Sequence, residues 1–241
     1  AWSGLSILID DIEVTEEDLA EGKEAQTAIY VIRRNAGENH DRRAVKGDYY
    51  LSDMELSNIK KVAAAFKHTV IVLNSCVIDA NFIEETAGID GALLLGQAGM
   101  EAGNALADVL TGKVSPSGHL TDTWAKKYED NPASATFGSN DGDNLQEDYV
   151  EDIYVGYRYF DTFDVEPLYP FGYGLSYGKI TYADASVSKT AAVIGDTVTV
   201  QAVVKNESDY PLYEAVQVYV HDVESETRTP IWQLRGVQCV C

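Results

Sequence analysis

The chain has 241 residues, of which 45% are hydrophobic and 24% are charged, so it can bury a substantial core in one large domain or two smaller ones. Its formal net charge of -21 repels phosphate backbones and anionic membrane surfaces, and no basic stripe reverses that charge locally. No apolar run approaches the roughly 20 residues of a membrane span, so neither nucleic acid nor a membrane is expected as a partner.

Cysteine and histidine are scarce and show no metal-ligand pattern. Cys76, Cys239 and Cys241 are odd in number and are not spaced as zinc ligands. The four histidines are scattered along the chain, so neither a metal ion nor a cofactor is expected. Unpatterned cysteines and the lack of a visible export signal predict ordinary thiols in a cytoplasmic protein. The chain begins with Ala1 and ends inside the strand-like pattern WQLRGVQCVC, which we interpret as a fragment.

The N-terminal part is expected to contain a lead-in, 1–26, followed by a buried strand at 27–32, TAIYVI. A helix is predicted after a long loop, because Ser52 and Glu55 have the S-x-x-E spacing of a capping box. Apolar residues at steps of three and four give this helix one face for packing against a sheet. They are Leu56, Ile59, Ala63 and Phe66.

Two further buried strands are predicted at 69–73 and 92–95 from short apolar runs. A helix rich in small residues follows at 97–112, and its Gly112 suits a C-terminal cap. The side chains of this helix that are expected to pack inward are Leu106, Val109 and Leu110. Because such strands alternate with helices, 27–135 is predicted to be an α/β domain, a three-layer α/β/α sandwich with a mostly parallel sheet.

A polar, acidic and aromatic-rich connecting segment is expected at 136–179. Its aromatic patch is open to two interpretations, a sugar subsite that stacks on rings or an inter-domain core, and the general burial of large rings favours core. The patch consists of Tyr149, Tyr154, Tyr157, Tyr159 and Phe160. The adjacent carboxylates of Glu151 and Asp152 point to opposite sides of an extended segment, so we interpret them as structural.

The C-terminal part changes to a period of two from about Ile180 onward. Apolar residues alternate with polar ones in two runs, separated by the turn-rich KNESDYPLYE. The apolar members are Val198, Val200, Ala202 and Val204 in the first run and Val216, Val218 and Val220 in the second. This pattern predicts an incomplete immunoglobulin/fibronectin III-like β-sandwich over 180–241.

One loop carries residues suited to acid/base chemistry. In VIRRNAGENHDRR, 31–43, Gly37 allows a sharp bend beside Glu38. A general acid needs a raised pKa, whereas Arg34, Arg42 and Arg43 would lower the pKa of a close carboxyl. From the residues alone two interpretations stay open: Glu38 is a solvated, salt-bridged loop charge, or it is a catalytic acid.

Three ordered motifs in this chain resemble glycoside hydrolase family 3. The run VIRRNAGENHDRRAVKGDYYLS resembles the SGEG-x-DR loop of its β-glucosidases, and GQAGMEAGNALADVLTGKVSPSGHL resembles the family's helix and NPSGKLP loop. The segment YVEDIYVGYRYFDTFDVEPLYPFGYGLSY is similar to the family's connection to a fibronectin-like domain. The matches span 27–177, and together they are far more specific than any one motif.

The resemblance implies roles for four residues. Glu38 matches the family's acid/base glutamate, and Arg34, Asp41 and Arg42 match its flanking positions, which bind substrate or support the loop. The family's usual Ser and second Gly in this loop are replaced here. Ala36 stands in place of that Ser, and Asn39 stands in place of that Gly. In the second motif, His119 and Thr121 stand where the family has a lysine and a proline after PSG. Asn tolerates left-handed backbone, so the bend of the loop is expected to persist.

The resemblance also implies a retaining β-glycosidase in which this chain supplies only one of two carboxyl groups. The nucleophile would be an aspartate on a separate (β/α)8 barrel, which these residues do not contain and which could lie before or after them. The isolated chain is therefore expected to be inactive. The expected partners are that barrel and a β-linked oligosaccharide or glycoside.

The substrate is expected to be a terminal β-D-glucosyl residue, with a β-xylosidase as the nearest alternative. A different class stays open, a non-catalytic carbohydrate-binding or interaction module that kept the fold. A flavodoxin-like nucleotide-binding domain is disfavoured, because the sequence has neither G-x-G-x-x-G after a strand nor a P-loop.

Overall fold

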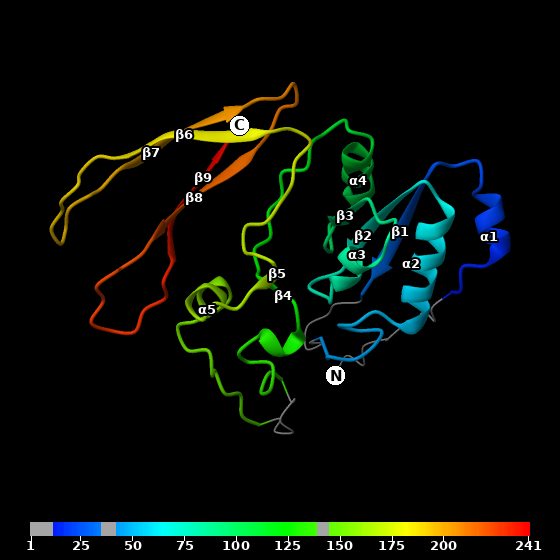
Figure 1. Cartoon of the computed structure of the whole chain (residues 1–241), viewed down its shortest axis with the longest axis horizontal. Coiled ribbons are helices and arrows are strands. Elements are labelled where there is room, and N and C mark those ends of the chain that lie inside the picture. Colours follow the sequence, from blue (N-terminus) through cyan, green and yellow to red (C-terminus); the bar gives the residue numbers. More distant parts are fainter. Residues whose placement is uncertain (1–11, 35–41, 139–144) are drawn as a thin grey trace. The chain divides into compact units, whose positions relative to one another are not determined.

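The structure, a computed structural model, describes residues 12–34, 42–138 and 145–241 (Figure 1). The chain forms two units, one within residues 1–100 with 126–128 and the other within 101–125 and 129–241. The first unit has a parallel sheet with helices, and the second has antiparallel strand pairs, which is the predicted order of α/β followed by β. The boundaries expected at residues 26, 135 and 179 stay predictions.

A three-stranded parallel sheet forms the centre of the first unit. Its strands are β1 (Thr27–Arg33), β2 (His68–Asn74) and β3 (Gly91–Leu94), in the order β1-β2-β3. Thr27 pairs with His68, and Val70 pairs with Gly91. The helix α2 (Asp53–Ala65) connects β1 to β2 and packs against both, and the short α3 (Asn81–Glu85) precedes β3 (Figure 1). All three predicted strands are therefore confirmed to within about one residue.

The helix α2 begins at the predicted capping box. The Ser52 hydroxyl accepts the Glu55 backbone N–H at 3.0 Å, and the Ser52 N–H donates to Glu55 Oε2 at 2.8 Å. The expected apolar face is only partly right: Ile59 and Ala63 are buried, whereas Leu56 and Phe66 are half-buried. The buried face instead includes the polar Glu55 and Asn58, because both side chains are hydrogen-bonded within the unit.

Asn58 holds the segment that precedes the sheet. Its Oδ1 accepts the Val14 N–H and its Nδ2 donates to the Ile12 carbonyl, both at 2.8 Å. This segment leads into α1 (Glu16–Glu21), which begins at a capping box formed by Thr15 and Asp18. The sequence pattern predicted only a lead-in here, so α1 was not predicted.

The core of this unit follows from strand position. Ile71 and Val72 of the central strand β2 are fully buried, whereas in the edge strand β1 only alternate side chains face inward. Ile32 is buried, and Ile29 and Val31, on the other face of β1, are half-exposed. Within the described residues, β1 is thus covered on one face rather than the expected two.

The second unit begins with α4 (Ala102–Leu110), five residues later than predicted. Gly112 follows it with φ +73°, as a glycine after a helix end often does. The inward-facing residues predicted for this helix, Leu106, Val109 and Leu110, are half-buried. The remaining elements before the strand pairs are β4 (Trp124–Ala125), the 3-10 helix η1 (Tyr128–Asp130), α5 (Tyr157–Thr162) and β5 (Pro167–Tyr169), which pairs with β4.

The aromatic patch packs mainly as core. Phe160 is almost fully buried, and the Tyr157 ring lies 5.1 Å from that of Phe171 and 5.6 Å from that of Tyr219. Tyr149 is the exception, because its side chain is exposed. Within this unit the bulk of the patch therefore supports folding rather than an open stacking surface.

Two antiparallel strand pairs complete the second unit (Figure 1). They are β6 (Ile180–Val187) with β7 (Val200–Asn206), and β8 (Glu214–Val220) with β9 (Gln233–Val240). The two pairs are joined where the Tyr182 hydroxyl donates to Glu214 Oε1 at 2.5 Å. Burial, together with the hydrogen bond and charge of Glu214, raises the pKa of Tyr182 to about 12.

The burial pattern of the sheet gives a stability prediction. Ile71→Ala removes a side chain that is 0% exposed, so we expect it to lower the free energy of unfolding by about 2–5 kcal/mol. The matched control, Ile29→Ala, removes the same group from a site that is 50% exposed and should cost about 1 kcal/mol or less. Urea denaturation of both variants measures the difference, and equal losses would contradict the assignment of β2 as the central buried strand.

Candidate functional site

The candidate site lies where β1 ends and the chain continues toward α2. Of the four site residues expected from the sequence, Arg34 and Arg42 are described by the structure. Glu38 and Asp41 lie outside the described residues. The carboxyl ends of parallel strands are the usual position of ligand sites in α/β sheets, so this is the edge at which a functional loop is expected.

Arg34, the first residue after β1, is held in a buried ion pair. Its two terminal nitrogens donate to the two carboxylate oxygens of Glu55, at 2.6 and 2.8 Å. Its Nε donates to the Asp48 carbonyl at 2.7 Å, and the residue is only 8% exposed. A guanidinium bound in this two-pronged way has one orientation, so Arg34 fixes the end of β1 against the first turn of α2.

The backbone of Arg34 is fixed as well. Its N–H donates to the Asn74 carbonyl at the end of β2, at 3.2 Å, and its own carbonyl accepts from Gln97 Nε2 at 3.2 Å. Gln97 lies just beyond β3. Groups at the ends of all three strands therefore meet at this residue.

Arg42 is held by Asp48, whose two carboxylate oxygens each accept a hydrogen bond. Arg42 donates to Asp48 Oδ1 at 2.8 Å, and the Arg43 backbone N–H donates to Oδ2 at 3.0 Å. Burial raises the pKa of the Asp48 carboxyl, but the hydrogen bonds and charges of Arg42 and Arg43 outweigh this and keep the pKa below its usual value. The Asp48 carboxyl is therefore ionised at neutral pH.

Asp48 also contacts the chain on both sides of the segment that carries Glu38. Its carbonyl accepts from Arg34, before residues 35–41, and its carboxylate accepts from Arg42 and Arg43, after them. A turn centred on Gly47, whose φ is +83°, makes this double contact possible. The two ends of the segment are thereby attached to one residue.

Three residues of this cluster were missed or only partly identified by the sequence analysis. Glu55 was identified as a helix cap but not as the partner of Arg34, which is 21 positions away. Asp48 and Gln97 were not identified at all. One signal in the sequence pointed to such partners, namely the surplus of arginines in one short loop. Buried arginines need carboxylates nearby.

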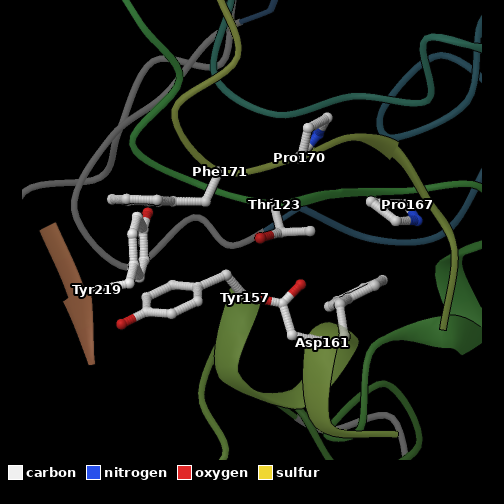
Figure 2. Close-up of a pocket in the computed structure, with 8 residues that line it drawn as sticks. Thr123, Tyr157, Asp161, Pro167, Pro170, Phe171 and Tyr219 are labelled. Carbon is white, nitrogen blue, oxygen red and sulfur yellow. The ribbon is translucent and has the colours of Figure 1, made fainter. Parts of the chain in front are cut away.

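A small cavity in the second unit is a weaker candidate (Figure 2). It has a volume of about 90 Å³, larger than a single water needs and well below the roughly 300 Å³ of an ordinary ligand pocket. Figure 2 shows the Asp161 side chain extending from α5 toward Thr123, whose hydroxyl is buried with no hydrogen-bond partner in the described part of the chain. Burial raises the pKa of Asp161. The volume is too small for a saccharide active site.

Across the residues that the structure describes, no three His, Cys, Asp or Glu side chains are grouped as metal ligands. In the same residues, no helix combines the length and the apolar character needed to cross a membrane.

The buried ion pair gives a prediction with an internal control. Glu55→Ala leaves the Arg34 charge buried without its carboxylate, so we expect a loss of about 3–5 kcal/mol in the free energy of unfolding. Asp53→Ala removes another first-turn carboxylate of α2, one paired with Lys46 at 2.6 Å on an exposed surface, and should cost about 0–1 kcal/mol. Equal losses in denaturant titrations would show that the Arg34–Glu55 contact has no special weight.

Comparison with known proteins identifies the family. Residues 3–177 match the glycosyl hydrolase family 3 C-terminal domain. The chain is 41% identical over 171 residues to the thermostable β-glucosidase B of Acetivibrio thermocellus, covering 71% of this chain and 22% of that protein. It is 39% identical over 184 residues to an exo-α-(1→6)-L-arabinopyranosidase of Bifidobacterium longum, covering 76% of this chain and 23% of that protein.

A solved structure agrees with these relatives. The structure of β-glucosidase 3B from Thermotoga neapolitana in complex with glucose has a TM-score of 0.86 and 38% sequence identity, over 95% of this chain and 32% of that one. This chain thus spans about a fifth to a third of the length of the relatives it matches. It belongs to glycosyl hydrolase family 3 and contains that family's C-terminal domain.

Proposed function

We propose that this chain is the part of a retaining β-glycosidase that supplies the general acid/base, and that Glu38 is that residue. The observation that carries the proposal is the attachment of both ends of the 35–41 segment to Asp48, in a chain of family 3. A general acid must stay within hydrogen-bond reach of the leaving oxygen, so a segment that carries one needs fixed ends.

The charges around the segment also support an acid. Free arginines would lower the pKa of a nearby carboxyl and keep it ionised. Here Arg34 is paired with Glu55, and Arg42 and Arg43 share the carboxylate of Asp48, so most of the positive charge is offset. The carboxylates of Glu55 and Asp48 are occupied by these contacts. Glu38 is proposed as the acid because it matches the family's acid/base glutamate.

In the proposed reaction Glu38 acts twice. It first donates its proton to the glycosidic oxygen as the bond to the leaving group breaks and the nucleophile attacks the anomeric carbon. It then accepts a proton from the water that releases the sugar from the enzyme. The two carboxyl groups of such a pair lie roughly 5–5.5 Å apart, so the second carboxylate must be brought close to this loop.

We assign the nucleophile, an aspartate, to a (β/α)8 barrel domain of the same protein. The chain covers 22% of the Acetivibrio relative, which leaves ample length for a barrel of about 250 residues. The half-site in this chain would then be inactive alone and complete only with the barrel.

The proposed substrate is a terminal non-reducing β-D-glucosyl residue. The names of the Acetivibrio and Thermotoga proteins support a glucosidase. The Bifidobacterium relative, similar to the same degree, is named for an arabinopyranoside. Because relatives with different sugars share this domain, we infer that the sugar is selected mainly outside it, and a β-xylosidase remains the alternative.

A cytoplasmic location is proposed on the state of the cysteines. Cys76, Cys239 and Cys241 are all free and exposed. Exposed free thiols are typical of reducing compartments, in which disulfides are rare.

The role of Glu38 is tested in the complete enzyme. Glu38→Gly should lower kcat/KM on phenyl or alkyl β-glucosides by about 10²- to 10⁴-fold, because their leaving groups need a proton. It should change kcat/KM much less on 2,4-dinitrophenyl β-glucoside, whose leaving group departs unprotonated. Added azide should raise kcat of the variant, since a small anion can replace water without a general base.

The control for this experiment is Asp53→Asn, which removes one charge from an exposed pair near the same loop. It should leave both substrates unaffected. Equal losses of Glu38→Gly on the two leaving groups would remove Glu38 from the acid/base role. An unmodified complete protein with no activity on either substrate would instead favour a non-catalytic module.

A further inference from the structure

We propose that the groove between β8 and the 118–120 and 172–174 backbone segments is a saccharide-binding site separate from the acid/base loop. The groove has a volume of about 450 Å³, within the range of ordinary ligand pockets. It lies wholly within the second unit. Its lining residues are His119, Gly172, Tyr173, Gly174, Tyr182, Glu214, Ala215 and Gln217.

One wall of the groove is a rigid backbone ladder. The Leu120 N–H donates to the Tyr173 carbonyl, and the Gly172 N–H donates to the Leu120 carbonyl, both at 2.8 Å. A Cβ at Gly174 would lie 2.5 Å from the Gly118 carbonyl, so only glycine permits this close approach. The wall is therefore preformed, which lowers the entropic cost of binding a ligand.

The opposite wall presents a carboxylate whose orientation is fixed. Glu214 Oε1 accepts the Tyr182 hydroxyl, which leaves Oε2 facing His119 Nε2 at 3.9 Å. This gap is too long for a hydrogen bond, but one hydroxyl group fits between the two atoms at about 2.8 Å from each. A hydroxyl can accept from the imidazole and donate to the carboxylate at the same time, which a cation or an anion cannot do.

Two further groups add contacts of the same chemistry. Gln217 Oε1 accepts the Tyr219 hydroxyl, whereas its amide nitrogen donates to no group in the described chain. A Cβ at Gly172 would lie 2.8 Å from that nitrogen, so the glycine keeps the space around it open. Tyr173 stacks on Tyr169 with a centroid distance of 5.0 Å, and the residue is still 39% exposed, so part of its ring is open to C–H groups.

Paired acceptors and donors beside an aromatic ring match a neutral polyhydroxylated ligand. A single water would satisfy the His119–Glu214 gap but would leave most of the groove unused. A free monosaccharide or the end of an oligosaccharide supplies several hydroxyls and an apolar ring face together. We infer a sugar, held by a few hydrogen bonds and one ring contact, with an affinity in the millimolar range.

The test is an NMR titration of the 15N-labelled 241-residue chain with glucose and with cellobiose. Under the proposed function this chain lacks the nucleophile domain, so binding does not depend on a complete active site. We expect amide shifts confined to the groove residues Gly172, Gly174, Ala215 and Gln217, which saturate with a Kd of about 1–10 mM. A lack of shifts up to about 50 mM of either sugar would overturn the proposal.

Two variants locate the site. Glu214→Gln replaces one carboxylate oxygen, either the one facing His119 or the one bonded to Tyr182, by an NH2 donor. Gln217→Ala removes the amide nitrogen that has no partner in the described chain. Each should weaken binding by about three- to tenfold, the range expected for the loss of one hydrogen bond. The control Glu224→Gln makes the same charge change outside the groove and should bind as the unmodified chain does.

The outcomes separate this site from the acid/base half-site. Unchanged affinity in both groove variants, or shifts in residues around Arg34 instead, would overturn the groove assignment and leave the proposed function intact. If one variant fails to give a folded spectrum, the other variant still decides between the outcomes. Binding that is lost in both groove variants but kept in Glu38→Gly supports the groove whatever role Glu38 has.

Discussion

The bidentate ion pair between Arg34 and Glu55 is the contact on which the candidate site depends. Burying two charges is costly, and replacing such a pair by apolar groups is often neutral or stabilising, so the pair is weak evidence for stability alone. What it provides here is a fixed position for the residue at which the chain leaves β1. The pair also leaves no net charge at this position, so Arg34 does not act on a nearby carboxyl as an unpaired cation.

Glu55 joins fold and site in one side chain. Its Oε2 accepts both from the backbone N–H of Ser52, which completes the cap of α2, and from the Arg34 guanidinium. The start of the helix and the end of the strand are thereby set by the same carboxylate. Asp48 has a parallel role beyond the loop, because its carbonyl contacts Arg34 while its carboxylate contacts Arg42. The cap of α2 and the position of the chain after β1 therefore depend on the same side chains.

The sequence predicted those features that arise from local patterns. The three parallel strands and the capping box of α2 were predicted correctly, because apolar runs and the S-x-x-E spacing act over a few residues. The polar members of the buried face of α2, Glu55 and Asn58, were not predicted, since hydropathy alone places charged and amide side chains outside. Their partners are distant in sequence: Arg34 for Glu55, and Ile12 and Val14 for Asn58.

The role proposed for Glu38 came from the family motif and not from the residues themselves. The three neighbouring arginines argued against a general acid as long as their partners were unknown. Contacts with Glu55 and Asp48 remove much of that objection, because Arg34 is paired with Glu55 and the other two arginines share Asp48. Pairings of this kind depend on the folded backbone, so a single sequence contains no direct signal for them.

We propose, above all, that this chain holds one half of a glycosidase active site. The most direct test of this proposal is the hydrolysis of a panel of nitrophenyl β-glycosides by the purified 241-residue chain, alone and beside the complete protein. We expect activity only in the complete protein, with the panel identifying the sugar. Activity of the isolated chain would contradict this proposal, because the nucleophile would then lie within these residues.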